Sequence, residues 1–186
     1  MYVAMFTSRS KDNTEVTNFK PRTKMFFADQ ECIAYVGDFE KFVKEGVPGE
    51  MSRFYISVSA RNMEKTQKEL ACRLIKDEID MRNLNALAVS IAMQSEHEIT
   101  KKWLFDFDCP SFNEASEFFH EINMMSIPVH MVNSPNGYSI IVDHGFDTRD
   151  FLEKWNKRLR EINPSYGVEL KRNAMLIVDW EKNVGE

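Results

Sequence analysis

Two aspartates separated by one residue close an apolar run near the middle of the chain. Residues 101–108 read KKWLFDFD, so the run ends with Asp106 and Asp108. Because successive side chains of a β-strand point to opposite faces, the two carboxylates would share one face, about 6.5–7 Å apart. Like charges at that spacing repel each other, and a hard divalent cation such as Mg²⁺ or Mn²⁺, which takes oxygen ligands, removes the repulsion. The pattern indicates metal-dependent chemistry, unless the strand simply ends here and Cys109 begins a solvated loop.

A third carboxylate closes another hydrophobic run near the end of the chain. Residues 175–178 read MLIV, and Asp179 follows them. If this strand and the strand of Asp106 and Asp108 are neighbours in one sheet, three carboxylates converge at its edge. Such a set is what a one-metal or two-metal phosphoryl-transfer site requires, and it makes the three aspartates candidate metal ligands and catalytic residues. A solvated strand end is the alternative interpretation of Asp179.

Between the two acidic strands lies a turn of small and polar residues. Residues 134–139 read SPNGYS, and proline together with Asn-Gly favours a tight reversal between strands expected at 128–133 and 138–142. The glycine permits close approach of another backbone, and the N–H and hydroxyl groups of the turn are suited to holding a phosphate. The candidate phosphate-binding residues are Ser134, Asn136, Gly137 and Ser139, together with the bases Lys171 and Arg172 near the last strand. As a plain turn, the segment needs no function.

The three motifs, in this order, resemble those of archaeo-eukaryotic-type primases and primase-polymerases. In that superfamily an Asp-x-Asp pair and a later aspartate hold divalent metals, while a middle motif, small-x-His, contacts the phosphates of the incoming nucleotide. The resemblance matches Asp106 and Asp108 to the first motif and Asp179 to the third. It implies an RRM/primase-like core, Mg²⁺ or Mn²⁺ as cofactor, a nucleotide or nucleic acid as partner, and nucleotidyl transfer in DNA replication.

Ser139 stands where the middle motif of that superfamily has histidine. A serine hydroxyl can hydrogen-bond a phosphate, but it cannot supply an imidazolium. Among the histidines, His144 is the one to test as a surrogate. The departure leaves a second function open, that of a non-catalytic accessory protein that binds a host protein or nucleic acid on the same scaffold. The chain also looks like small proteins encoded by tailed bacteriophages, which implies the cytoplasm of a host cell as its location.

A haloacid-dehalogenase-type phosphatase is the competing enzymatic interpretation. Asp106 and Asp108 would then be the nucleophile and the acid/base, and Ser134 the hydroxyl residue at the end of the second strand. Such an enzyme also uses Mg²⁺. Pro110 replaces the usual threonine or valine after the aspartates, and no convincing Gly-Asp-x-x-x-Asp follows. We therefore rank this interpretation below the primase-like one.

Composition restricts the class of protein. The chain has 186 residues, 43% hydrophobic and 28% charged, which is typical of a soluble globular protein. Its formal net charge of −5 gives no overall electrostatic signature of nucleic-acid binding. The three cysteines lie far apart and outside any zinc-binding spacing, which favours a reducing cytoplasm. Nothing approaches the roughly 18 apolar residues of a transmembrane helix, so we expect no membrane partner.

The periodicity of the apolar residues predicts an α+β fold with a mixed, mostly antiparallel sheet packed on helices. Ser111 and Glu114 form a capping-box pattern at the start of a helix that follows the acidic strand. The other expected elements are strands at 2–7, 23–28 and 53–59, helices at 30–44, 62–80 (capped by Asn62), 84–94 and 148–162, and a closing hairpin of 167–171 with 174–179. We expect one compact domain, in which residues 1–100 form an N-terminal portion of unassigned role and residues 101–186 carry the motifs.

Overall fold

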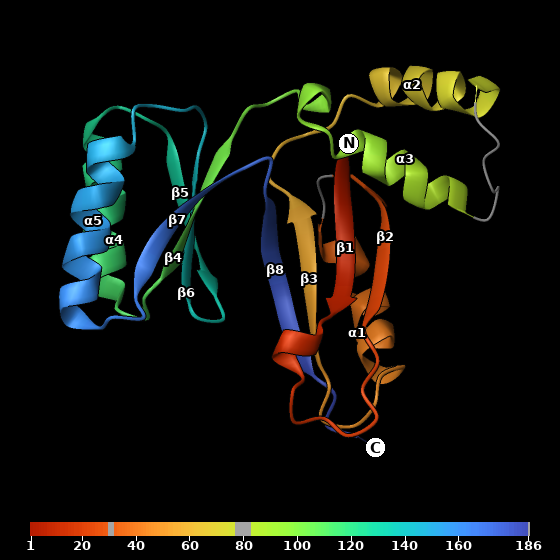
Figure 1. The fold of residues 1–186 in the computed structure, drawn as a ribbon, viewed down its shortest axis with the longest axis horizontal. Coiled ribbons are helices and arrows are strands. Elements are labelled where there is room, and N and C mark those ends of the chain that lie inside the picture. The colour runs from red at the N-terminus through yellow and green to blue at the C-terminus, as the bar shows by residue number, and fades with distance from the viewer. Residues whose placement is uncertain (30–31, 77–82, 186) are drawn as a thin grey trace. The chain divides into compact units, whose positions relative to one another are not determined.

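The computed structural model describes residues 1–29, 32–76 and 83–185. In these residues the chain forms five α-helices and two four-stranded sheets, and every pair of neighbouring strands is antiparallel (Figure 1). The predicted combination of helices with antiparallel strands is confirmed, although two sheets replace the single sheet that we expected. The chain divides into two compact units, of which unit 1 comprises Met1–Ile99 and Met175–Glu186 and unit 2 comprises Thr100–Ala174. None of the helices described is long and apolar enough to cross a membrane.

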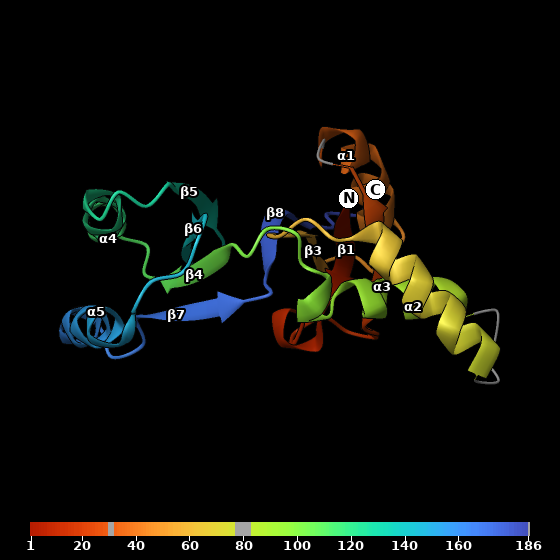
Figure 2. The same cartoon turned by 90° about the horizontal axis from the view of Figure 1, so that it is seen from above.

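Unit 1 is a sheet with helices on both faces. Its elements are β1 (Tyr2–Ser8), β2 (Arg22–Ala28), α1 (Val36–Lys44), β3 (Met51–Ser57), α2 (Met63–Lys76), α3 (Leu84–Ala92) and β8 (Met175–Lys182). The strand order is β2-β1-β3-β8. Alternation along β1 places Phe6 in the core beneath α1 and Val3 in the core beneath α3, and α2 packs on α3 (Figure 2).

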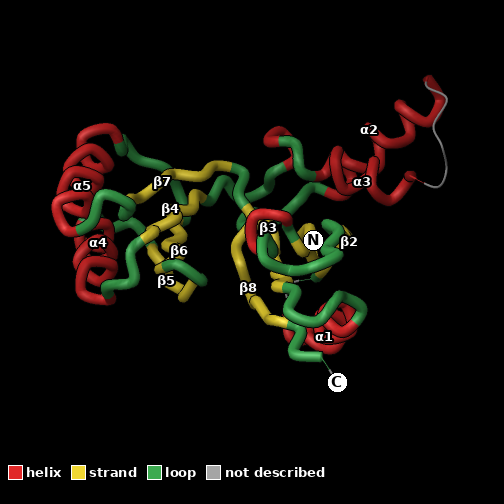
Figure 3. The backbone as a smooth tube through the Cα atoms, turned by 60° about the horizontal axis from the view of Figure 1, so that its bottom comes forward, coloured by secondary structure: helices red, strands yellow, loops and turns green. Residues whose placement is uncertain are grey.

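Unit 2 is a sheet with both of its helices on one face (Figure 3). Its elements follow one another in the order β-α-β-β-α-β. They are β4 (Trp103–Asp108), α4 (Phe112–Met124), β5 (Val129–Ser134), β6 (Gly137–Val142), α5 (Arg149–Ile162) and β7 (Gly167–Arg172). The strands are arranged β5-β6-β4-β7, so β4 is an interior strand that pairs with β6 on one side and with β7 on the other.

Alternation along β4 decides what the two faces of the unit 2 sheet carry. Phe105 and Phe107 are fully buried and pack against Phe118 of α4, with ring centroids 5.3 Å apart in both pairs. The ring of Phe107 also lies 6.2 Å from that of Trp155 on α5. The two aspartates of β4 alternate with these rings, and they therefore lie on the face that points away from α4 and α5.

The caps at Ser111 and Asn62 and the turn of the β5–β6 hairpin form as the sequence predicts, whereas the carboxylate of Glu114, the other half of the capping box, is ion-paired with Arg158. The hydroxyl of Ser111 accepts a hydrogen bond from the backbone N–H three residues later at 3.5 Å, and the side chain of Asn62 accepts the equivalent bond at 2.9 Å. These bonds satisfy N–H groups that the first turns of α4 and α2 leave without helical partners. The β5–β6 hairpin also forms, with Ser134 and Gly137 paired across its turn. The end expected for α2 near residue 80 and the start expected for α1 at residue 30 lie outside the described residues.

The closing hairpin does not form, and that prediction is wrong. Strands occur at both places, but β7 pairs with β4 in unit 2, whereas β8 pairs with β3 in unit 1 and buries Ile177 there. Asn173, between them, has a positive φ of 51°, a conformation that asparagine tolerates better than most residues. Unit 2 begins at Thr100, next to the division expected at residue 100, but the last strand returns to unit 1. Period-two patterns indicate strands without indicating their partners.

Replacing Gly137 with alanine should destabilise unit 2. An added Cβ would meet the carbonyl oxygen of Phe107 and would lie 2.7 and 2.8 Å from backbone atoms of Cys109, which cannot swing aside as a flexible side chain can. Overpacking of this kind costs about 1–3 kcal/mol and would lower the midpoint of urea unfolding. Gly37→Ala is the control, because a Cβ at that position of α1 meets nothing within 4 Å and should not lower stability. A Gly137→Ala protein as stable as the wild type would contradict the close packing of the turn against β4.

Candidate functional site on the acidic face of unit 2

Asp106 and Asp108 share their face of the unit 2 sheet with a glutamate from the next strand. Glu169 of β7 is the direct partner of Asp106, so both side chains emerge on the same side of the sheet. Asp108 and Glu169 are exposed, and Asp106 is partly buried. We call this surface the acidic face and define it by Asp106, Asp108 and Glu169. The strand pairing thus supplies a third carboxylate beside the predicted pair.

Lys171 is the counter-ion of the acidic face. Its ammonium is ion-paired with Asp106 and lies 3.6 Å from the carboxylate of Glu169. Burial is the largest single influence on the pKa of Lys171 and lowers it, but the hydrogen bond to Asp106 and the charges of the three carboxylates together outweigh burial, so the pKa is raised. Lys171 is therefore fully charged at neutral pH and takes the place of a cation between Asp106 and Glu169.

The β5–β6 hairpin places the predicted turn beside the acidic strand. Ser139 on β6 is the direct partner of Asp106 and is buried. Gly137 lies against the end of β4, where an added Cβ would strike the backbone. Ser134 is partly buried, and Asn136 is exposed at the tip of the hairpin. The turn and the acidic pair are thus neighbours, which is what a shared role in binding phosphate requires.

Asp179 does not adjoin the acidic pair in a common sheet. It lies on β8 in unit 1, where its direct partner is Phe54 of β3. Its carboxylate accepts a hydrogen bond from the backbone N–H of Trp180 at 2.8 Å. The condition for three converging aspartates, that their strands are neighbours, is therefore not met. Hydrophobic runs that end in aspartate look alike in sequence whichever sheet they join.

The two predicted bases fall on opposite faces of the unit 2 sheet. Lys171 belongs to the acidic face, whereas the guanidinium of Arg172 lies 4.5 Å from the ring centre of Trp103, on the side of the helices. This separation follows from the period of two along β7. Contact with the face of an aromatic ring stabilises the guanidinium where it is. Arg172 therefore has a packing role and is not part of the acidic face.

His144 follows the end of β6 that is remote from the turn. β6 begins at Gly137 and ends at Val142, whose partner on β4 is Trp103, the first residue of that strand. The next residue, Asp143, is ion-paired with Lys102 at 2.8 Å, and this contact holds the pKa of its carboxyl below the usual value. The position gives no support to His144 as a surrogate for the missing motif histidine.

Sequence reasoning missed Glu169, although a signal for it exists. Within β7, Val168 and Leu170 pack with the core of unit 2, while Glu169 and Lys171 alternate with them. This alternation predicts that Val168 and Leu170 face the core and that Glu169 and Lys171 face the other side of the sheet. It does not reveal that β7 lies next to β4, and only that neighbourhood brings Glu169 to Asp106.

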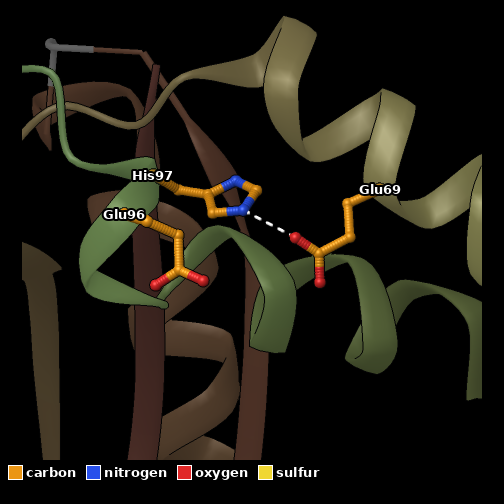
Figure 4. A group of neighbouring side chains, drawn as sticks. All are labelled: Glu69, Glu96 and His97. Atoms are coloured by element: carbon orange, nitrogen blue, oxygen red, sulfur yellow. Dashed lines mark hydrogen bonds and ion pairs between the residues drawn. The ribbon is translucent and has the colours of Figure 1, made fainter.

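A different group of ligand-type side chains lies in unit 1. Glu69, Glu96 and His97 form the one group, among the residues that the structure describes, in which three such side chains offer ligand atoms all within 4.8 Å of one another (Figure 4). The carboxylates of the acidic face do not converge as closely. Sequence reasoning missed this group as well, because Glu69 lies 28 residues before His97 and no motif joins them.

Two groups of ligand-type side chains are thus present, the acidic face in unit 2 and the Glu69, Glu96 and His97 group in unit 1. No protein-family model matches the chain, and no curated protein is significantly similar to it. The roles of both groups must therefore follow from their own geometry and charge.

Proposed function

We propose that unit 2 binds nucleotides and performs divalent-metal-dependent nucleotidyl or phosphoryl transfer on its acidic face, as a primase-like core. The observation that carries the proposal is the connectivity. A β-α-β-β-α-β chain with the strand order β5-β6-β4-β7 has the split β-α-β arrangement of ferredoxin-like domains, to which an RRM-like core conforms. Within it the Asp-x-Asp pair lies on the interior strand β4, next to the strand that carries Ser139. The cofactor in this proposal is Mg²⁺ or Mn²⁺.

The composition of the acidic face argues against base recognition in the manner of RRM domains. Those domains stack bases on aromatic side chains of the sheet. On the acidic face, β4 presents Leu104 and the two aspartates, and β6 presents Ser139 and Ile141. Carboxylates repel a phosphate backbone unless a cation lies between them. The face is therefore better suited to a metal-complexed triphosphate than to a bare nucleic-acid strand.

Asp106 and Glu169 would hold the divalent ion at the place that the ammonium of Lys171 occupies. Carboxylate oxygens are ligands that Mg²⁺ and Mn²⁺ prefer, so the donor set fits. The displaced ammonium of Lys171 then contacts the triphosphate, and N–H groups of the turn at residues 134–137 donate hydrogen bonds to the phosphate oxygens. When bound, the ion neutralises phosphate charge and favours deprotonation of the attacking hydroxyl.

Thermal unfolding with Mn²⁺ and a nucleoside triphosphate tests this proposal. The two ligands together should stabilise the wild type more than either does alone, with a shift in Tm of about 4–8 °C for each kcal/mol of binding energy in a unit of this size. Asp106→Asn keeps the shape of the side chain and removes its charge, so it should abolish the shift. Asp179→Asn is the matched control and should keep the shift, because Asp179 lies in the other sheet.

Lys171→Met separates metal binding from nucleotide binding. This variant should bind Mn²⁺ alone more tightly than the wild type, because the competing cation is gone, and bind the triphosphate less tightly. The proposal fails if neither ligand stabilises the wild type or if Asp106→Asn responds as the wild type does. Metal stabilisation without a nucleotide effect, together with hydrolysis of a simple phosphate ester, would favour the phosphatase instead. For the phosphatase interpretation, which uses Ser134 together with the two aspartates, the strand order matters. Strand β5, which ends at Ser134, is not next to β4, which carries the aspartates, because β6 lies between them.

A non-catalytic accessory protein is the second candidate, and the ion pair of Lys171 is the observation that favours it. Asp106 already has a cation beside it, so the charge of this carboxylate is compensated without metal. Ser139 in place of the motif histidine also favours a non-catalytic role, because a serine hydroxyl cannot supply an imidazolium. In this candidate the primase-like scaffold binds a host protein or nucleic acid, and Lys171 is a structural residue.

In metal-free buffer, Lys171→Met should destabilise unit 2 by about 0.5–1 kcal/mol, a small value because solvent screens a side chain that is 41% exposed. Since folding raises the pKa of Lys171 above its ordinary value of 10.5, the stabilising contribution of its charge is complete below pH 10.5 and is lost as the pH rises further. Urea unfolding of both proteins at neutral pH and well above pH 10.5 measures the difference. Lys157→Met, at an exposed lysine of α5, is the control. Equal stability of wild type and Lys171→Met at neutral pH would contradict a structural role.

A further inference from the structure

His97 is fully buried, although it belongs to the short 3₁₀ segment η4 (Ser95–His97). Its Nε2 atom lies 2.9 Å from Oε2 of Glu69 on α2, and the side chain of Glu96 completes the group (Figure 4). Glu69 is partly buried and Glu96 is exposed, so the group is accessible from the side of Glu96. One imidazole nitrogen and two carboxylates are ligands that Zn²⁺ takes.

The two less exposed ligands are held on their far sides by residues outside the group. Oγ1 of Thr66 lies 2.9 Å from Nδ1 of His97 and also bonds to the carbonyl oxygen of Asn62 at 2.8 Å. Arg73 donates to Oε1 of Glu69 at 2.5 Å, which leaves Oε2 directed at His97. Metal-ligating histidines and carboxylates have such second partners, which fix the orientation of the ligand. The ring of His97 is thus held with Nε2 aimed at the carboxylates.

Hydrogen bonds that do not use the ligand atoms tie the two elements together. The backbone N–H of Asn62 donates to the carbonyl oxygen of His97 at 2.8 Å, and the ammonium of Lys65 donates to the carbonyl oxygen of Glu96 at 2.8 Å. Asn62 and Lys65 lie at the start of α2, the helix that carries Glu69. The side chains of His97 and Glu69 and the backbone of Glu96 are therefore positioned before an ion arrives, which lowers the entropic cost of binding.

We infer that Glu69, Glu96 and His97 form a Zn²⁺ site in unit 1. Nε2 of His97 and one oxygen of each carboxylate ligate the ion, which takes the place of the direct contact between His97 and Glu69. Any proton on Nε2 is released to solvent on binding. Three protein ligands leave a fourth tetrahedral position to water. This site lies in unit 1 and does not rest on the function proposed for the acidic face.

Calorimetric titration of the chelator-treated full chain with ZnCl₂ tests this inference. We expect one Zn²⁺ at this site in the wild type and a loss of affinity of at least about tenfold in Glu96→Gln and in Glu69→Gln. Glu96 is exposed, so its variant should keep the wild-type fold, which circular dichroism verifies. Glu64→Gln, at an exposed glutamate of the same helix, is the matched control and should bind Zn²⁺ as the wild type does.

Two further variants exclude other sources of Zn²⁺ binding. Cys72→Ser removes an exposed thiol three residues from Glu69 on α2, and Asp106→Asn disables the acidic face. Both should bind Zn²⁺ at this site with wild-type affinity. The inference is overturned if the wild type binds no Zn²⁺, if Glu96→Gln binds as tightly as the wild type, or if Cys72→Ser or Asp106→Asn is the variant that loses binding.

Discussion

Alternation of side chains along β4 is the constraint on which unit 2 depends. The strand is paired on both edges. Because its side chains alternate between the two faces of the sheet, its two phenylalanines fill the core beneath α4 and α5 and its two aspartates emerge on the other face. A shift of one residue in register would bury two carboxylates and expose two aromatic rings, and the free-energy cost of burying the charges would unfold unit 2. The same register sets Lys171 and Ser139 in their places. The position of the acidic face therefore follows from the packing of the core, and Lys171 offsets one of its three negative charges.

The acidic face and the group around His97 show two ways of holding carboxylates. On the acidic face, three carboxylates lie on neighbouring strands, and a single lysine contacts two of them, Asp106 and Glu169. Around His97, a buried imidazole is fixed by Thr66, and Glu69 is fixed by Arg73, so the ligand atoms are already close. The first arrangement suits an ion that arrives with a phosphate ligand, and the second suits an ion held by the protein itself.

Much of the local structure could be predicted from the sequence, because its signals are local. The cap at Ser111 and the turn that precedes Gly137 lie within a few residues of the elements they define. Strand partners could not be predicted in the same way. Asp179 follows a hydrophobic run like that of β4, yet β8 pairs with β3. No residue near Asp179 in the sequence indicates which strand β8 pairs with. His97 lies in a polar segment, and its burial beside Thr66 of α2 depends on tertiary packing that the local sequence does not indicate.

The central claim is that the acidic face takes a divalent cation, and amide NMR spectra with added Mn²⁺ test it most directly. Paramagnetic Mn²⁺ broadens the signals of nuclei near its site, so the measurement locates the ion without relying on activity. We predict broadening of the amide signals of residues 106–108 and of Glu169 in the wild type, and its loss in Asp106→Asn. Sharp signals from these residues at Mn²⁺ concentrations that broaden the signals around His97 would contradict the claim.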